Sequence, residues 1–125
     1  MELAGEGLLL RVFLGESDRY RGRPAWEALM LRARELGLAG CTVIRGLAGF
    51  GAASRIHTAK IERLSLDLPI LVEFVDTAEK IRAFLPEVET MVPQGLATLE
   101  RVEVHFYRHG GERPSEASGG RGDGT

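Results

Sequence analysis

The order of two apolar patterns along the chain limits the folds that it can adopt. Segments that are apolar throughout, or that alternate apolar and polar residues, predict strands at 8–14, 41–47, 70–75 and 98–107. After the first and third of these strands, apolar residues recur every three to four positions, as on one face of a helix. The chain therefore consists of two strand–helix–strand units, joined by an excursion over residues 59–68 whose period is ambiguous.

Helix boundaries are indicated by residues that start or stop a helix. The first predicted helix begins at Pro24, which lacks the N–H that would have no partner in a first turn. Gly37 ends this helix, and Trp26 belongs to its apolar stripe, where we expect it to anchor the core. The second helix begins at a capping-box pattern, Asp76 to Glu79, and includes Pro86, at which we expect a kink or a break into two short helices.

These elements predict an α+β fold with the ferredoxin-like βαββαβ order, in which two helices cover one face of a four-stranded antiparallel sheet. The first strand is apolar on both sides, with Leu9 and Phe13 opposite to Leu10 and Val12. The sheet face without helices therefore needs a cover, which we expect other subunits to provide. The inward residues that we expect from the last strand are Val102, Val104 and Phe106.

Composition excludes several classes of protein. The 16 Lys and Arg against 18 Asp and Glu leave a net charge of −2, so no overall positive field favours nucleic acid. The single cysteine, Cys41, excludes an internal disulfide and a multi-cysteine zinc site, and we expect it to be a small buried side chain. No apolar run is long enough for a membrane helix and no secretory leader is visible, so we expect a cytoplasmic protein. Residues 1–109 are expected to form one domain, and 110–125 a disordered tail rich in Gly, Ser and charge.

One stretch, residues 40–60, has a distinct chemical theme. It runs from an apolar strand through Gly46, Gly49 and Gly51 into a basic segment. Glycines permit a ligand to approach backbone N–H groups closely, and positive charge beside such groups suits an anion. The basic residues of the stretch are Arg45, Arg55, His57 and Lys60. The stretch therefore predicts a small-anion site.

Catalytic and metal-binding patterns are present only in part. Ser54, His57 and Asp67 have the residue types of a nucleophilic triad, but no strand-to-helix elbow surrounds the serine. His105 and His109 lack the setting of a helical ligand pair, and no acid adjoins His57. The glycines do not have the spacing of a Walker loop or of a dinucleotide-binding loop. We therefore expect no catalytic residue and no metal site.

Five segments carry a resemblance to a known family. They are GESDRYRGRP (15–24), GLAGCTVIRGLAGFG (37–51), SRIHT (54–58), DLPILVEFVD (67–76) and FLPEVETMVPQGLATLERVEV (84–104). Through them the chain resembles the uncharacterised PII-like family known as domain of unknown function 190, from about Leu8 to Tyr107. It is more distantly similar to nitrogen-regulatory PII signalling proteins, through its element order and through the Gly-Phe-Gly at 49–51.

The resemblance implies a homotrimer that binds a small anionic effector, such as the adenine nucleotides ATP, ADP or AMP, in clefts between subunits. It also implies control of a membrane transporter, a channel or an enzyme through a long loop, here residues 55–66, and no nucleic acid partner. By the resemblance, Gly49 and Gly51 would offer backbone N–H groups to phosphate, and the turn at Gly95 would face them. Together with Phe50 and the basic residues Arg45, Arg55 and His57, these are the binding residues that we expect. The turn at Gly95 departs from PII proteins, since it reads QGLAT in place of Gly-Asp-Gly-Lys, and the loop is shorter and lacks the usual modified tyrosine.

Two alternatives from other classes remain open at this stage. One is a small enzyme that uses His57 as a general acid or base, which would show a pH–rate profile that His57→Ala abolishes. The other is a structural trimer whose basic loop docks a membrane transporter without any ligand.

Overall fold

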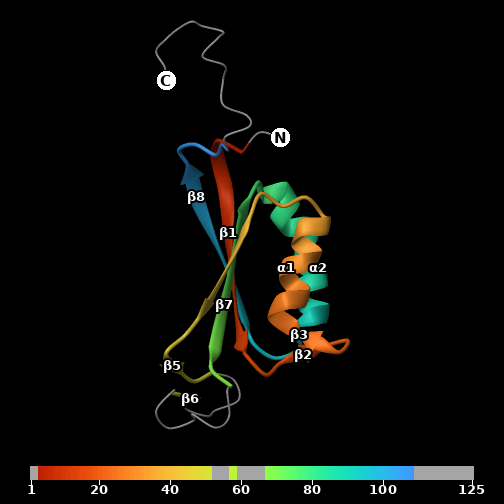
Figure 1. Ribbon diagram of the computed structural model, residues 1–125. Coiled ribbons are helices and arrows are strands. Elements are labelled where there is room, and N and C mark those ends of the chain that lie inside the picture. The colour runs from red at the N-terminus through yellow and green to blue at the C-terminus, as the bar shows by residue number, and fades with distance from the viewer. Residues whose placement is uncertain (1–2, 52–56, 59–66, 109–125) are drawn as a thin grey trace, which may run out of the picture.

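The computed structural model describes residues 3–51, 57–58 and 67–108 of the chain. Ten elements lie within these ranges (Figure 1). In chain order they are β1 (Gly5–Gly15), β2 (Arg19–Tyr20), β3 (Arg23–Pro24), α1 (Ala25–Glu35), β4 (Cys41–Arg45), β5 (Ala48–Gly49), β6 (His57–Thr58), β7 (Pro69–Asp76), α2 (Ala78–Met91) and β8 (Leu96–Val104). The predicted tail, 110–125, and most of the predicted excursion lie outside the described residues.

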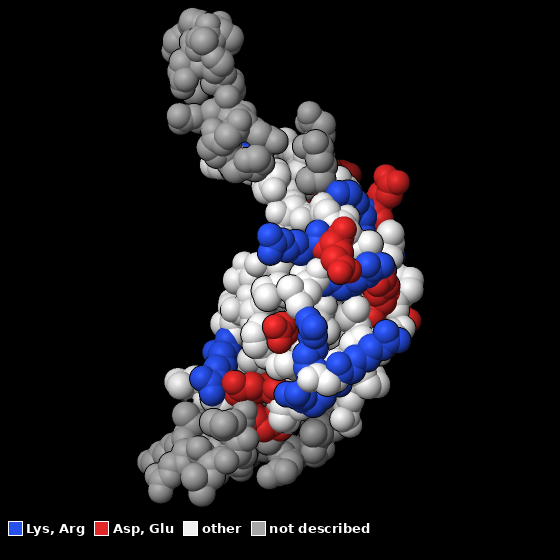
Figure 2. All heavy atoms as spheres, turned by 45° about the vertical axis from the view of Figure 1, so that its right-hand side comes forward, with Lys and Arg blue, Asp and Glu red and all other residues white. Residues whose placement is uncertain are grey.

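The main sheet has four antiparallel strands in the order β4-β7-β1-β8. Both helices lie on the same face of this sheet (Figure 1). The predicted ferredoxin-like fold is therefore confirmed. Figure 2 shows charged side chains of both signs spread over the side of the molecule that carries the helices.

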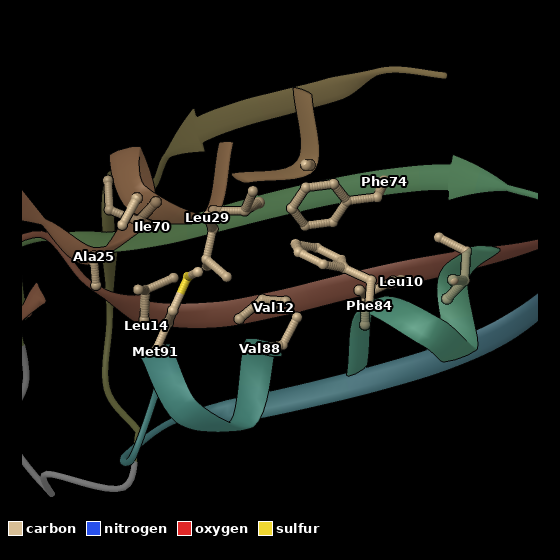
Figure 3. Packing of buried hydrophobic residues seen from close by; sticks show 14 of the residues in the cluster. Leu10, Val12, Leu14, Ala25, Leu29, Ile70, Phe74, Phe84, Val88 and Met91 are labelled. Atoms are coloured by element: carbon tan, nitrogen blue, oxygen red, sulfur yellow. The ribbon is translucent and has the colours of Figure 1, made fainter. Parts of the chain in front are cut away.

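The hydrophobic core fills the space between the helices and the sheet (Figure 3). Alternate residues of β1 point into it, and Leu10 and Val12 are fully buried there. Phe74 of β7 and Phe84 of α2 meet edge to face, with ring centroids 5.2 Å apart and planes at 74°. This is the geometry that the aromatic quadrupole favours. Trp26 packs against the core as a partly buried side chain, in agreement with its predicted role.

The second helix does not break at Pro86, although a break there was one of the outcomes expected from the sequence. α2 runs without interruption from Ala78 to Met91. Its buried residues are Ile81, Phe84, Val88 and Met91. Pro86 lies on the exposed side. The missing N–H therefore costs one hydrogen bond on the solvent side, while the packing of the buried stripe keeps the helix continuous.

The start of α2 is within two residues of its predicted position, but the capping residue is Thr77. The hydroxyl of Thr77 accepts a hydrogen bond from the N–H of Lys80 at 3.3 Å, so Glu79 does not take the capping-box position. Asp76 is the last residue of β7, and strand alternation turns its side chain into the core, where it is fully buried. Its carboxylate accepts from the N–H of Ala39 at 2.8 Å and of Thr77 at 2.6 Å. Asp76 thus ties the loop before β4 to the end of β7.

The second predicted strand was too long by two residues. β4 ends at Arg45, because its partner strand β7 begins at Pro69. The next carbonyl along that strand, of Leu68, accepts instead from the N–H of Glu16 at 2.8 Å. Leu47 therefore has no ladder position, and its side chain is exposed.

The predicted facing of the last strand was wrong. In β8, Leu99 lies opposite Leu10 and Ala97 lies opposite Val12. Residues that lie opposite each other in an antiparallel pair share a face, so Val102 lies on the face away from the helices. The strand also ends at Val104, so Phe106 lies beyond it and is exposed.

An apolar row crosses all four strands on the uncovered face of the sheet. The strand register places Ile44 beside Leu71, Leu71 beside Phe13, and Phe13 beside Leu96. All but Leu71 are among the exposed large hydrophobic residues. In the next row Arg11 forms ion pairs with Glu73 at 2.9 Å and Glu100 at 3.2 Å. We call the residues Phe13, Ile44, Leu71 and Leu96 the apolar row.

Candidate functional site

The Gly-rich stretch lies at the end of the sheet where β4 ends and β7 begins (Figure 1). β5 and β6 form a small antiparallel pair there, with Ala48 opposite Thr58 and Gly49 opposite His57. We call residues 45–51 together with 67–69 the loop base. The loop base therefore holds both ends of the segment that the sequence predicts to be a switch.

Glycine is required at the loop base because the chain packs against the ring of Pro69. The N–H of Gly46 donates to the carbonyl of Pro69 at 2.6 Å. A Cβ at Gly46 would lie 2.8 Å from Pro69 Cγ, and one at Gly49 would lie 3.2 Å from the same atom. The first distance is shorter than carbon atoms tolerate. Gly46 thus serves backbone packing.

Gly51 has a different environment. A Cβ at Gly51 would meet no atom within 4 Å, and the neighbouring Phe50 is 75% exposed. The structure therefore leaves room for a side chain at Gly51, and the use of this residue as a ligand contact stays a prediction. The two glycines of the Gly-Phe-Gly motif differ, since Gly49 packs on Pro69 and Gly51 does not.

Arg45 is held in place by a residue that the sequence did not single out. Its Nε lies 3.2 Å from Glu16 Oε1, and the guanidinium remains about half exposed. Glu16 belongs to the turn after β1, and the backbone of this turn is bonded to the loop base at two points. The N–H of Glu16 donates to Leu68, and the N–H of Ser17 donates to Asp67 Oδ1 at 3.0 Å. Arg45 thus presents a half-exposed guanidinium at the loop base, with Glu16 as its carboxylate neighbour among the described residues.

The structure brings together only some of the predicted site residues. The loop base contains four of them, namely Arg45, Gly49, Phe50 and Gly51. Arg55 lies outside the described residues, and His57 is described only through its place in β6. Gly95 lies at the same end of the sheet, before β8. Because β7 and β1 separate β4 from β8, Gly95 is three strand spacings, or about 14 Å, from the end of β4 within one chain.

Gly95 is required for a packing reason of its own. A Cβ at this position would lie 2.6 Å from the carbonyl oxygen of Phe13 and 3.0 Å from Val92 Cγ1. The turn from α2 into β8 can therefore close against β1 only with glycine.

Two hollows in the described part of the chain lie away from the loop base. One, of about 310 Å³, is lined by residues that include Cys41, Val75 and Tyr107, and the hydroxyl of Tyr107 donates to the carbonyl of Ala39 at 3.0 Å. The other, of about 700 Å³, lies between β1, β8 and the start of α2 and includes Arg82 and Arg101. Neither hollow is lined by a predicted site residue.

The described residues provide neither a cluster of metal ligands nor a reactive thiol at the loop base. Among the described residues, no three His, Cys, Asp or Glu side chains converge on a point. Cys41 is partly buried rather than fully buried, and this burial raises the pKa of its thiol to about 11. The thiol is therefore protonated at neutral pH and a poor nucleophile.

Sequence reasoning missed Glu16, Asp67 and Pro69 as parts of the site. Glu16 is 29 positions from Arg45, and Ser17 is 50 positions from Asp67. Of the three, only Pro69 could have been recognised from the sequence, because a proline at the start of a strand next to a Gly-rich segment indicates a close crossing of two backbones.

Comparison with known proteins assigns the chain to a family. The family model of DUF190, described as an uncharacterized ACR, matches residues 7–104. The chain belongs to this family. A UPF0166 protein of Aquifex aeolicus is 44% identical over 98 residues, which cover 78% of this chain and 92% of that protein. A UPF0166 protein of Methanocaldococcus jannaschii is 31% identical over 101 residues, covering 80% and 91% respectively.

Two solved structures share the fold of this DUF190 protein. One is CPII, a nitrogen regulatory PII-like protein from Thiomonas intermedia, bound to ADP, AMP and bicarbonate. It has a TM-score of 0.63 and 14% identity, covering 81% of this chain and 90% of CPII. The divalent ion tolerance protein CutA1 from Ehrlichia chaffeensis has a TM-score of 0.50 and 9% identity, covering 79% and 81%. The resemblance to a PII-like family is thus confirmed at the level of family and fold.

Neither α1 nor α2 is long and apolar enough to cross a bilayer.

Proposed function

We propose that this protein is a PII-like cytoplasmic regulator that assembles into a homotrimer and binds a small anionic effector, an adenine nucleotide, between subunits. The bound effector sets the conformation of the loop that leaves the loop base, and the loop controls a transporter or an enzyme. We assign no catalytic step to the protein.

The observations that carry the proposal are the room around Gly51, where a Cβ would meet no atom within 4 Å, and the half-exposed guanidinium of Arg45 in the same loop base. Backbone N–H groups next to a cation form the kind of concavity that binds phosphate. The same fold in CPII is described with bound ADP, AMP and bicarbonate, which supports an adenine nucleotide as the effector and makes bicarbonate the anion to compare with it.

Two further features support a site between subunits. Gly95 and Arg45 lie at the same end of the sheet but three strands apart, so one phosphate group cannot touch the backbone at both positions within a single chain. A second copy of the chain, docked on the uncovered face of the sheet, would bring its own strand ends near the loop base of the first. The apolar row gives such a copy a surface to cover, since burial of exposed apolar area drives association.

A thermal-shift panel of ATP, ADP, AMP, bicarbonate and phosphate tests the proposal. A nucleotide present at about 100 times its Kd stabilises the folded state by about 2.7 kcal/mol, which raises Tm by several degrees. Gly51→Val, which covers the open backbone, and Arg55→Ala should each reduce this shift. A panel without any saturable shift, or a shift that neither variant alters, contradicts the proposal.

A further inference from the structure

The β2–β3 hairpin carries three arginines in five residues, Arg19, Arg21 and Arg23. Its two strands pair Arg19 with Pro24 and Tyr20 with Arg23, so the loop consists of Arg21 and Gly22 alone. Both loop residues have positive φ, +52° for Arg21 and +85° for Gly22. This is the pattern of a type I′ turn, which matches the twist of a hairpin.

Arginine is an unusual choice for the first loop position. A positive φ disfavours most side chains, and Asn, Asp or Gly is the common residue there. Among the described residues, Arg21 is the one non-glycine residue with positive φ. Its guanidinium lies over the ring of Tyr20, 5.1 Å from the centroid, which fixes its direction without neutralising its charge. Backbone strain kept at an exposed charged residue suggests that the side chain has a task outside the fold.

None of the three hairpin arginines has a carboxylate partner in the part of the chain that the structure describes, whereas Arg11, Arg32 and Arg45 each have at least one. One Arg19 nitrogen donates to the carbonyl of Gly22 at 2.9 Å, a neutral acceptor. All three residues are exposed. Figure 2 shows blue side chains projecting from the lower part of the helical side, the end at which Figure 1 places β2 and β3.

The hairpin is fixed to the body of the protein and lies next to the loop base. The carbonyl of Asp18 accepts from the N–H of Ala25 at 2.8 Å, and its carboxylate accepts from the N–H of Gly15 at 2.9 Å. The intervening residues, Glu16 and Ser17, are bonded to Leu68 and Asp67 of the loop base. The arginines are therefore presented on a rigid turn, at the end from which the predicted switch leaves.

We propose that the β2–β3 hairpin is a docking surface for a partner protein that presents a cluster of carboxylates. The inference rests on the proposed function, because it names the chemistry by which the regulated target is recognised. Guanidinium groups match carboxylates with two parallel hydrogen bonds, and a convex turn fits an acidic hollow in a protein better than it encloses a small ligand.

Membranes and nucleic acid fit the hairpin less well. Three arginines near an anionic bilayer improve partition by roughly a hundredfold, too little for stable anchoring. Nucleic acid is bound largely through its phosphate backbone, and a short convex turn on a chain of net charge −2 is a poor match for such an extended row of phosphates.

Fluorescence anisotropy with a labelled twelve-residue polyglutamate peptide tests the inference. The variant Arg19→Gln/Arg21→Gln/Arg23→Gln should weaken binding at least tenfold. The control Arg34→Gln/Arg82→Gln/Arg101→Gln removes the same charge from exposed arginines elsewhere and should change binding less than twofold. No measurable binding, equal losses in the two variants, or tighter hairpin-dependent binding to phosphatidylserine vesicles or duplex DNA overturns the inference.

Stability and nucleotide response separate this inference from its rivals. Asn accepts positive φ more readily, so Arg21→Asn should raise Tm by roughly 2–6 °C while it weakens peptide binding. A fall in Tm would show that Arg21 serves the fold, and it overturns the docking role. The hairpin variant should keep the thermal shift with nucleotide. If that shift is absent in every variant while the hairpin still binds the peptide, the proposed effector fails and the docking surface stands.

Discussion

Gly46 and Pro69 cross at the loop base with no room for a side chain between them. The N–H of Gly46 donates to the carbonyl of Pro69 at 2.6 Å, and a Cβ on Gly46 would lie 2.8 Å from Pro69 Cγ. This contact joins the end of β4 to the start of β7, so it fixes where the sheet stops and where the excursion begins.

Gly46→Ala should therefore destabilise the protein. The added methyl group must displace Pro69 or the backbone of β4, at a cost of about 1–3 kcal/mol, as for other overpacked sites. Urea unfolding followed by circular dichroism measures the change. Gly40→Ala is the matched control, because a Cβ at Gly40 would meet nothing within 4 Å. Equal stability of the two variants would contradict the close crossing.

Asp76→Ala should cost about 3 kcal/mol of stability, because it removes a fully buried carboxylate and leaves the partly buried N–H groups of Ala39 and Thr77 without their acceptor. Asp76→Asn should recover only part of this loss, since an amide has one acceptor oxygen in place of two. Glu79→Ala, at the exposed position that the sequence pattern had assigned to the cap, should stay within about 0.5 kcal/mol of wild type. A large loss of stability in Glu79→Ala together with a small loss in Asp76→Ala would contradict the structural role given to Asp76.

Phe13→Lys should keep the protein folded and prevent its assembly. Phe13 is 38% exposed in the centre of the apolar row, so a lysine is tolerated in one chain but would be desolvated under a second copy. Sedimentation velocity gives the oligomeric state. Leu36→Lys is the control, because Leu36 is 37% exposed at the end of α1, which lies on the other side of the sheet. Loss of assembly in the Leu36 variant alone would place the interface on the helical side.

Cys41 should react slowly with iodoacetamide in the folded protein. Burial raises the pKa of its thiol from 9.0 to about 11, so at pH 8 the thiolate fraction is about a hundredfold lower than in the unfolded chain. Because the folded pKa is the higher one, the associated stability is complete below pH 9 and is lost as the pH rises toward 11. Alkylation rates with and without urea measure the difference, and equal rates would show that the thiol is accessible.

Local patterns in the sequence predicted the elements well because each element buries a continuous stripe or an alternating face. The stripe of α2 is the clearest case, since Ile81, Phe84 and Val88 are all buried as their spacing required. The same reasoning failed for β8. As an edge strand, β8 has apolar residues on both faces, so alternation alone could not tell which face the pairing with β1 would bury.

The sequence identified the Gly-rich stretch as a candidate anion site, but it did not distinguish the roles of the individual glycines. Composition identified the stretch, yet only the position of Pro69 shows that Gly46 serves packing and that Gly51 does not pack against it. The Arg45–Glu16 pair joins residues that are 29 positions apart in the sequence. Asp76 is fully buried in the structure, whereas the local sequence pattern predicted it to be a helix cap. Long-range contacts of this kind depend on the register of the whole sheet, which no local pattern specifies.

Isothermal titration of ADP into wild-type protein and into the Phe13→Lys variant tests the central claim, that the effector site is completed between copies of the chain. The expected result is one ADP per chain in the wild type and no saturable heat in the folded Phe13→Lys monomer. Binding of ADP to that monomer with wild-type affinity would contradict the claim.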